Sequence, residues 1–391
     1  MKKHKFSSWP SYSKLELKAV SKVLSSGKVN YLYGQYGKIF EKNFARYINT
    51  KYSIAISNGT VALELALLSL SLNHNDEVIV TPRSYFSSAS SILKVGLKPI
   101  FADIDINSQN ITLDSIKKLI NKKTKVIICV HLAGFPCDMN EISSFARKKK
   151  IKIIEDCSQA HGAKIKNKKV GSFGDISVWS FCNDKIISTG GEGGMLTTNH
   201  RKYWQFMWSY KDQGKNYQKF FSKKNNNKFK YIHDNIGSNF RITEIQSIIG
   251  IIQLQNLDKN IKLRNIYAKL INKTLIKFPS VQTTKIKKYY IHSYYRYYFF
   301  INQKYLKKKW NRDKILKKIS SYNINCGTGS CPTIYKEKPF RNIFKTHKRK
   351  FINAEKLGKS SISLAIHHKL NYKEVILICN ILNKVLKEAT I

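Results

Sequence analysis

Short apolar runs alternate with longer segments of helical periodicity through the first 156 residues of the 391-residue chain. Each run has the length of a β-strand, and each intervening segment repeats its apolar residues at the spacing of an amphipathic helix. Strands separated by helices predict right-handed crossovers and therefore an α/β fold with a mostly parallel sheet. The expected strands lie, in chain order, at residues 52–57, 77–81, 99–104, 125–131 and 152–155.

The residues that directly follow these strands form a predicted ligand site. Ligands of parallel sheets bind at the carboxyl ends of the strands, where this chain places 58–60, Tyr85, Phe86, His131 and Asp156. The turn at 58–60 contains a glycine and opens a helix, so its free N–H groups and the helix dipole can bind an anion. An ordinary strand-to-helix turn with a serine or threonine cap explains the same residues.

The stretch 175–195 carries an apolar run that reaches a single lysine, Lys185, and then a glycine-rich turn. Burial at the end of a strand disfavours the charged form of a lysine and lowers its pKa, which makes Lys185 a candidate amine nucleophile. A solvated lysine beside a loop explains the same residue. The glycines allow close approach of the main chain to a bound group, and Glu192 among them is expected to be structural.

A second polar cluster follows the strand at 152–155. Asp156 stands at its end, and Gln159 and His161 follow within a few residues, so the three side chains are expected on the rim of the site. Asp156 could instead cap a helix, and His161 could be a buried histidine with satisfied hydrogen bonds. These alternatives stay open at this point.

The composition bounds the class of protein. The formal net charge of +46 comes from lysines scattered through every segment, so it favours anionic ligands rather than specific binding of nucleic acid. The seven cysteines include no C-x-x-C pair, which predicts reduced thiols and no metal site. No apolar run is long enough to span a bilayer, and the basic start lacks the apolar region of a signal peptide. We therefore expect a cytoplasmic protein with no membrane segment.

The pattern changes beyond residue 260, where aromatic strands near 294–301 are followed by helices at 312–322 and 373–386. We expect a large domain at 1–260 and a smaller C-terminal α+β domain at 261–391. The polar segment 213–234 within the first of these is predicted to be a mobile loop.

Seven motifs in the expected order resemble the DegT/DnrJ/EryC1/StrS family of sugar aminotransferases, which use pyridoxal phosphate (PLP) and have the fold type I, aspartate-aminotransferase-like architecture. The resemblance covers residues 26 to about 258 well and the remainder loosely. The motifs are SNGTVAL (57–63), GLKPIFADID (96–105), VHLAG (130–134), EDCSQAHGA (155–163), SFCNDK (180–185), GEGG (191–194) and NFR (239–241).

The resemblance implies a role for each matching residue. Lys185 would bind PLP covalently and act as general base and acid, Asp156 would pair with the pyridine nitrogen, and Gln159 would contact the side of the ring hydroxyl. The remaining cofactor contacts would come from Gly59, Thr60 and Ser180 at the phosphate, Phe86 stacked on the ring, and Asn239 reaching the phosphate in a neighbouring subunit of a homodimer.

The activity implied by the resemblance is a transamination. Glutamate would donate the amino group, leaving as 2-oxoglutarate, and a nucleotide-linked keto-deoxy sugar would accept it at C4 rather than C3. Two alternatives remain: a sugar dehydratase of the same fold, which replaces the lysine by histidine, and a regulatory or DNA-binding protein without enzyme activity.

Overall fold

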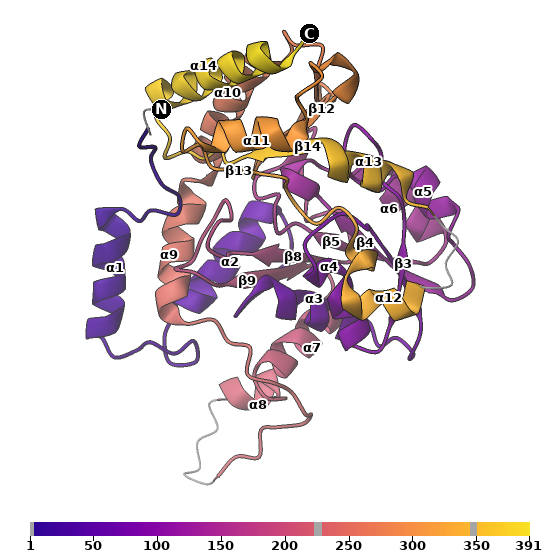
Figure 1. The fold of residues 1–391 in the computed structure, drawn as a ribbon. Helices are drawn as coiled ribbons and strands as arrows, with labels where there is room; N and C mark the ends of the chain where they lie inside the picture. The colour runs from indigo at the N-terminus through magenta and orange to yellow at the C-terminus, as the bar shows by residue number, and fades with distance from the viewer. Residues whose placement is uncertain (1–3, 223–228, 345–349) are drawn as a thin grey trace.

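A seven-stranded sheet runs through the middle of the molecule, with helices on both of its faces (Figure 1). The structure is a computed structural model that describes residues 4–222, 229–344 and 350–391. In spatial order the strands are β1 (Tyr52–Ile56), β9 (Gly194–Thr198), β8 (Ile176–Ser180), β5 (Lys152–Asp156), β4 (Thr124–Val130), β2 (Glu77–Val80) and β3 (Lys98–Phe101).

The strand directions match the predicted mostly parallel sheet. β8, β5, β4, β2 and β3 pair in parallel, whereas β9 pairs antiparallel with both β1 and β8. Within this sheet β9 alone runs in the opposite direction, so the other strands end at one edge. The expected strands are confirmed, with ends that differ by a few residues.

Both faces of the sheet are buried, because successive side chains of a strand point to opposite sides. Val178 belongs to a core cluster that contains α3 residues, while its neighbour Trp179 packs in a second cluster with Phe44 of α2. The helices that surround the sheet are α2 (Tyr36–Ile48), α3 (Gly59–Leu68), α4 (Ser87–Lys94), α5 (Leu113–Lys117), α6 (Met139–Lys148), α7 (Arg201–Lys211) and α9 (Glu244–Gln255).

A second layer follows in the C-terminal part of the chain (Figure 1). Its four-stranded sheet consists of β10 (Val281–Thr283), β12 (Tyr297–Ile301), β14 (Ser361–Leu364) and β13 (Cys326–Gly327). The accompanying helices are α10 (Leu257–Leu275), α11 (Arg312–Ser320), α13 (Ile352–Ser360) and α14 (Tyr372–Ala389), whereas α12 (Lys338–Phe344) packs on the first layer through Phe340 and Phe101 of β3.

Helix α10 crosses the position where the two domains were expected to divide. Its first turns, with Leu257 and Ile261, pack in the cluster around Trp179, whereas Ile271 and Leu275 pack with the C-terminal sheet layer. A boundary at residue 260 would therefore cut through a continuous helix, and the division into 1–260 and 261–391 stays a prediction.

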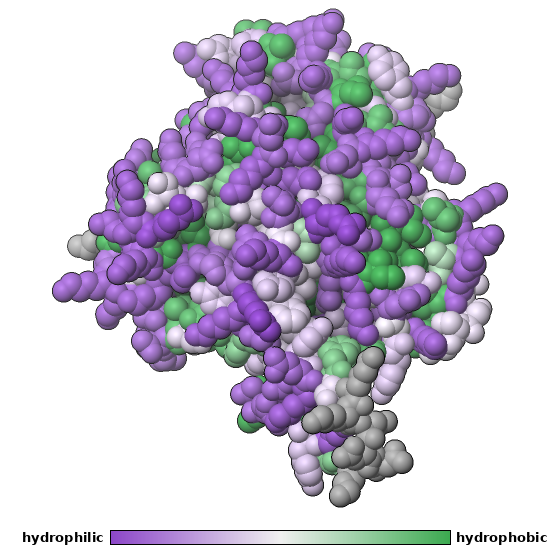
Figure 2. All heavy atoms as spheres, turned by 180° about the vertical axis from the view of Figure 1, so that it is seen from behind, coloured by the Kyte–Doolittle hydropathy of each residue, from purple (hydrophilic) through white to green (hydrophobic). Residues whose placement is uncertain are grey.

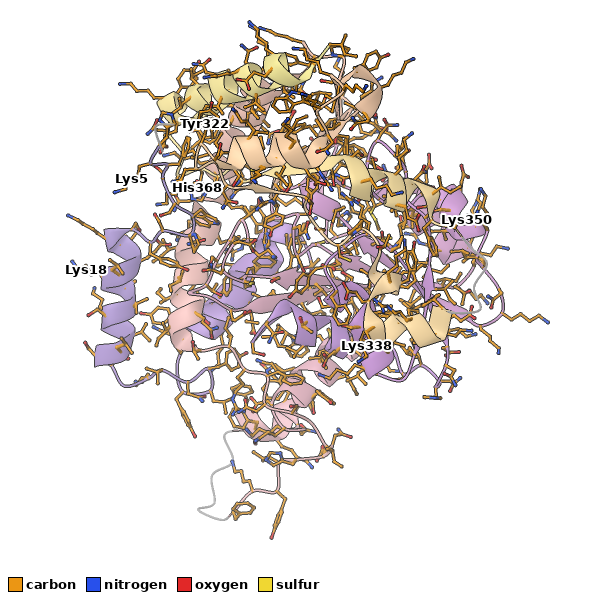
Figure 3. All side chains as sticks on the ribbon, viewed as in Figure 1. Lys5, Lys18, Tyr322, Lys338, Lys350 and His368 are labelled. Carbon is orange, nitrogen blue, oxygen red and sulfur yellow. The ribbon has the colours of Figure 1, made fainter. Side chains whose placement is uncertain are left out.

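The segment before α1 (Lys14–Ser25) connects the two layers. Ser7 donates its backbone N–H to Glu374 of α14 at 2.5 Å, and the Trp9 ring meets the His368 ring edge-on at 4.5 Å between centroids. Figure 3 labels His368 where this segment passes the C-terminal layer. The indole N–H of Trp9 donates to the backbone oxygen of Lys185 at 2.9 Å, so the segment reaches the predicted site.

The segment 213–234 is not the uninterrupted loop that was predicted, because it contains helix α8 (Tyr217–Phe221). The side chain of Asn216 accepts a hydrogen bond from Lys219 N and caps the helix, and the Tyr217 ring packs edge-on against Trp208 of α7. This packing between elements has no signature in the local composition. Residues 223–228 of the segment lie outside the described residues.

The surface carries hydrophilic side chains over most of the face shown in Figure 2, with hydrophobic ones scattered among them. In the described part of the chain, no helix has the length and apolar character that a membrane crossing requires.

Candidate active site

A cavity of about 830 Å³ lies at the carboxyl ends of the parallel strands. The turn after β1, the loop after β2 and the ends of β4, β5 and β8 form one side, and residues of the C-terminal part complete it. The predicted convergence of strand ends is therefore observed. The expected site residues that line this cavity are Gly59, Thr60, Asp156, Gln159, Ser180 and Lys185.

The first turn of α3 offers an anion site to this cavity. Asn58 caps the helix by accepting from the N–H groups of Thr60 and Val61, each at 3.0 Å. A Cβ atom added to Gly59 would lie 2.7 Å from the Cβ of Ser180, so only glycine lets the helix start approach β8 this closely. The helix dipole and the hydroxyls of Thr60 and Ser180 favour a phosphate at this end of the cavity.

Asp156 is a buried carboxylate with one face toward the cavity. Its side chain accepts from the Ser88 hydroxyl at 2.9 Å and from the backbone N–H of Ser158 at 3.1 Å. Gln159, on the next turn of chain, accepts from Ala133 N at 2.7 Å. The hydrogen bonds from Ser88 and Ser158 hold the Asp156 carboxylate in place, as pairing with a protonated ring nitrogen would require.

Lys185 contacts two side chains that the sequence did not connect with it. Its Nζ lies 3.2 Å from a carboxylate oxygen of Asp184 and 3.4 Å from the hydroxyl of Tyr295. Burial lowers the pKa of Lys185, but Tyr295 and the Asp184 carboxylate outweigh burial and hold this pKa above the ordinary lysine value. The structure therefore does not bear out the lowered pKa expected from the sequence, because the Asp184 carboxylate stabilises the ammonium form of Lys185.

Two of the predicted aromatic and polar contacts lie elsewhere. Phe86 is absent from the cavity lining and packs edge-on against Phe340 at 5.6 Å, whereas its neighbour Tyr85 lines the cavity. Asn239 is exposed on the surface, and its backbone forms an isolated antiparallel β-bridge with Asp212. The Asp212 side chain forms an ion pair with Arg241. Within one chain, Asn239 does not line this cavity.

His131 and His161 are both buried, and neither lines this cavity. His161 is 1% exposed and packs against Trp179 and Phe181, and neither ring nitrogen has a hydrogen-bond partner among the described residues. Burial, aided by the charges of Lys185 and Arg264, lowers the pKa of His161 to about 3. The expected position of His161 on the rim is therefore wrong.

His131 supports the sheet from inside. Its Nε2 lies 3.2 Å from Glu155, and its Nδ1 accepts from the backbone N–H of Cys137 at 3.0 Å. His131, Glu155 and Cys157 bring potential metal-ligand atoms within 4.8 Å of one another. The Glu155 oxygens, however, already accept from the backbone N–H groups of Gly171, Phe173 and Gly174. His131 and Glu155 therefore stabilise the fold through these hydrogen bonds.

The C-terminal contribution to the cavity had no signal in the local sequence. Tyr295, Arg296, Ser363 and residues 327–330 come from the second layer, more than 100 residues after Lys185 along the chain. Arg296 donates its Nε to the Ser363 hydroxyl at 3.2 Å and brings a guanidinium group to the cavity wall.

The residues present fit PLP. The start of α3 suits a phosphate dianion, the Asp156 carboxylate suits a pyridinium nitrogen, and the Lys185 amine lies on the wall of the same cavity. When bound, this cofactor supplies an electron-withdrawing ring that stabilises negative charge at the reacting carbon.

Comparison with solved structures defines the class of protein. The chain is similar to the aminotransferase from Psychrobacter cryohalolentis, with a TM-score of 0.95 and 39% identity over 98% of this chain and 99% of that chain. The fold is thus that of the fold type I aminotransferases that depend on PLP.

Comparison with known sequences defines the family. Residues 10–383 match the DegT/DnrJ/EryC1/StrS aminotransferase family, and the chain belongs to this family of PLP-dependent enzymes. It is 35% identical to GDP-perosamine synthase from Escherichia coli O157:H7 over 90% of each chain. It is 36% identical to dTDP-3-amino-3,6-dideoxy-alpha-D-galactopyranose transaminase from Aneurinibacillus thermoaerophilus over 70% of this chain and 73% of that one.

Gly59 gives a direct test of the phosphate end of the cavity. We expect Gly59→Ala to displace Ser180 or the first turn of α3 and to weaken PLP binding by about tenfold, since overpacking costs about 1–3 kcal/mol. Gly327→Ala is the matched control, because Gly327 lines the same cavity and an added Cβ there meets nothing within 4 Å. Equal PLP affinity of the two variants, measured by fluorescence titration, would contradict this reading.

Proposed function

We propose that this aminotransferase transfers an amino group from glutamate to a nucleotide-linked keto-deoxy sugar, at C4 rather than C3, for a glycan. One observation carries the proposal: the Lys185 amine, the Asp156 carboxylate and the start of α3 line one cavity. The names of the two relatives given above support a nucleotide-linked sugar as acceptor. Arg296 on the cavity wall and the excess of lysine suit the diphosphate of such a substrate.

The positions of the lining residues support the proposed cofactor contacts. Gly59, Thr60 and Ser180 hold the phosphate, Asp156 keeps the ring nitrogen protonated, and Gln159 lies on the side of the ring hydroxyl. We assign the stacking contact to Tyr85 instead of Phe86, because Tyr85 lines the cavity and Phe86 packs on Phe340.

Lys185 has two tasks in this proposal. It anchors the cofactor through its Nζ, and after the donor has displaced it, the free amine moves a proton at the substrate carbon as base and then as acid. Lys185 can accept the proton only as the neutral amine. The charges around Nζ therefore control when this proton transfer can occur.

The proposed assembly is a homodimer in the cytoplasm. Asn239 lies at the surface and does not line the cavity of its own chain, so it is free to reach the phosphate site of a second copy. The Asp212–Arg241 ion pair and the backbone bond from Ser57 N to Phe240 O at 2.9 Å hold this segment in place.

Two alternative functions differ from transamination in their products: a sugar dehydratase forms another product, and a DNA-binding protein forms none. A sugar dehydratase of this fold would release a deoxy sugar without nitrogen, and the lysine at position 185 disfavours it. A DNA-binding role would require affinity for one duplex sequence that persists as salt rises, whereas a nonspecific polyanion contact weakens equally for all sequences.

Lys185→Ala tests the anchoring residue. We expect the variant to lose the visible absorbance of the covalently bound cofactor. We also expect amine transfer to be slower by a factor of at least about 100, because general base catalysis is lost. Lys94→Ala is the control, since Lys94 lines the same cavity but pairs with Glu64 at 3.0 Å. A Lys185→Ala spectrum like that of the unchanged protein would refute the assignment.

Tyr85→Ala and Phe86→Ala separate the two neighbouring aromatic residues. Loss of a stacked ring costs about 0.5–1.5 kcal/mol beyond buried area, so we expect Tyr85→Ala to release PLP several-fold faster. Phe86→Ala should lower the thermal midpoint through its lost contact with Phe340 and leave PLP release unchanged. Faster PLP release from Phe86→Ala in dialysis, with Tyr85→Ala unchanged, would instead identify Phe86 as the residue that stacks on the cofactor.

Mixed dimers test the role of Asn239. If Asn239 completes the site of the partner, a hybrid of Lys185→Ala with Asn239→Ala subunits has one site with both changes and one with neither. Reassembly of the two weak variants should then give more activity than the average of the two alone. Activity equal to that average, with dimers present in sedimentation, would show that Asn239 acts within its own chain or not at all.

A further inference from the structure

Asp184, Lys185 and Tyr295 form a connected cluster on the wall of the cavity. One carboxylate oxygen of Asp184 lies 3.2 Å from Lys185 Nζ, and the other accepts from the Tyr295 hydroxyl at 2.5 Å. Lys185 Nζ also lies 3.4 Å from that hydroxyl and 4.9 Å from the centre of the Tyr295 ring. Both oxygens of Asp184 are thus used, one by the amine and one by a residue of the second layer.

The cluster lies between two cavities. Asp184, Tyr295 and Arg296 line the cavity described above and also a second one of about 250 Å³, bounded on its far side by the N-terminal segment with Trp9. The Trp9 indole holds the backbone oxygen of Lys185 from that side. The main chain of Lys185 is therefore fixed on one side while its amine contacts a carboxylate and a hydroxyl on the other.

We propose that Asp184 and Tyr295 form a docking site that holds the protonated amine of Lys185 whenever this amine is not attached to the cofactor. This inference rests on the proposed function, because it supposes that Lys185 alternates between attached and free states. Asp184 is a positioning residue here: it acts on the reaction through Lys185. No covalent step occurs at the docking site, and the proton stays on Nζ until the amine leaves the carboxylate.

The groups that face Lys185 fix the direction in which Asp184 shifts the pKa of this lysine. Asp184 and Tyr295 favour the ammonium form, Cys182 favours it further, and burial opposes it. Arg296 acts on Asp184, whose pKa is held below its usual range mainly by Lys185 against the opposing effect of burial. His161 stays neutral, since its pKa is lowered to about 3. Removal of the Asp184 charge should therefore release the Lys185 proton at a lower pH.

The full chain without cofactor provides the test. Acylation of Lys185 by an amine-reactive anhydride, followed by peptide mass spectrometry across pH, reports the neutral fraction of this amine. We expect Asp184→Asn to move the midpoint of labelling at Lys185 to lower pH by about one unit, and Asp184→Glu, which keeps the charge, to stay near the unchanged protein. Labelling of Lys18, an exposed lysine on α1, serves as the internal control.

An unchanged midpoint at Lys185 in Asp184→Asn would overturn the docking site, as would equal shifts in Asp184→Asn and Asp184→Glu. The Asp184 side chain is 51% exposed, so neither substitution removes buried packing, and Tyr295→Phe provides a third variant that frees one carboxylate oxygen. The measurement needs no cofactor. A shift at Lys185 in a protein that binds no PLP would show that Asp184 holds the amine, but it would refute the proposed function and with it the alternation of Lys185 between attached and free states.

Discussion

The common direction of β4, β5 and β8 is the constraint on which the site depends. Their parallel register sets Val130 beside Asp156 and Asp156 beside Val178, so the strand ends meet at one edge. A slip of one residue in β5 would exchange Asp156 with Glu155, whose side chain is held by backbone N–H groups on the other side of the strand. The backbone ladder therefore decides which carboxylate faces the cavity.

The proposed chemistry uses two carboxylates in different surroundings. Asp156 is buried and its carboxylate accepts from the Ser88 hydroxyl, which suits a fixed position opposite a ring nitrogen. Asp184 is half-exposed and contacts Lys185, which suits an interaction that forms and breaks during turnover. The close approach of Gly59 to Ser180 forms the end of the cavity proposed to bind the phosphate. Residues from the C-terminal layer line the opposite wall.

Much of this arrangement could be predicted from the sequence, because strand periodicity and the turns after the strands are local signals. The first sheet, the turn at Gly59, Asp156 and Lys185 all lie where expected. Contacts between distant segments could not be predicted. Tyr295 reaches Lys185 from 110 residues away, and α8 forms because its aromatic residues pack on Trp208. The contact of Phe86 with Phe340, which leaves Tyr85 as the aromatic residue of this pair on the cavity wall, joins segments more than 250 residues apart and has no local signal.

Transfer of labelled nitrogen directly tests whether this protein moves an amino group from glutamate to a nucleotide-linked keto sugar. The PLP-loaded protein would be incubated with ¹⁵N-glutamate, freed of excess donor, and mixed with nucleotide-linked 4-keto and 3-keto deoxy sugars. We predict that mass spectrometry finds ¹⁵N in the sugar made from the 4-keto compound, with 2-oxoglutarate formed in the first step. A sugar product without ¹⁵N, or one that has lost a hydroxyl group instead, would contradict it.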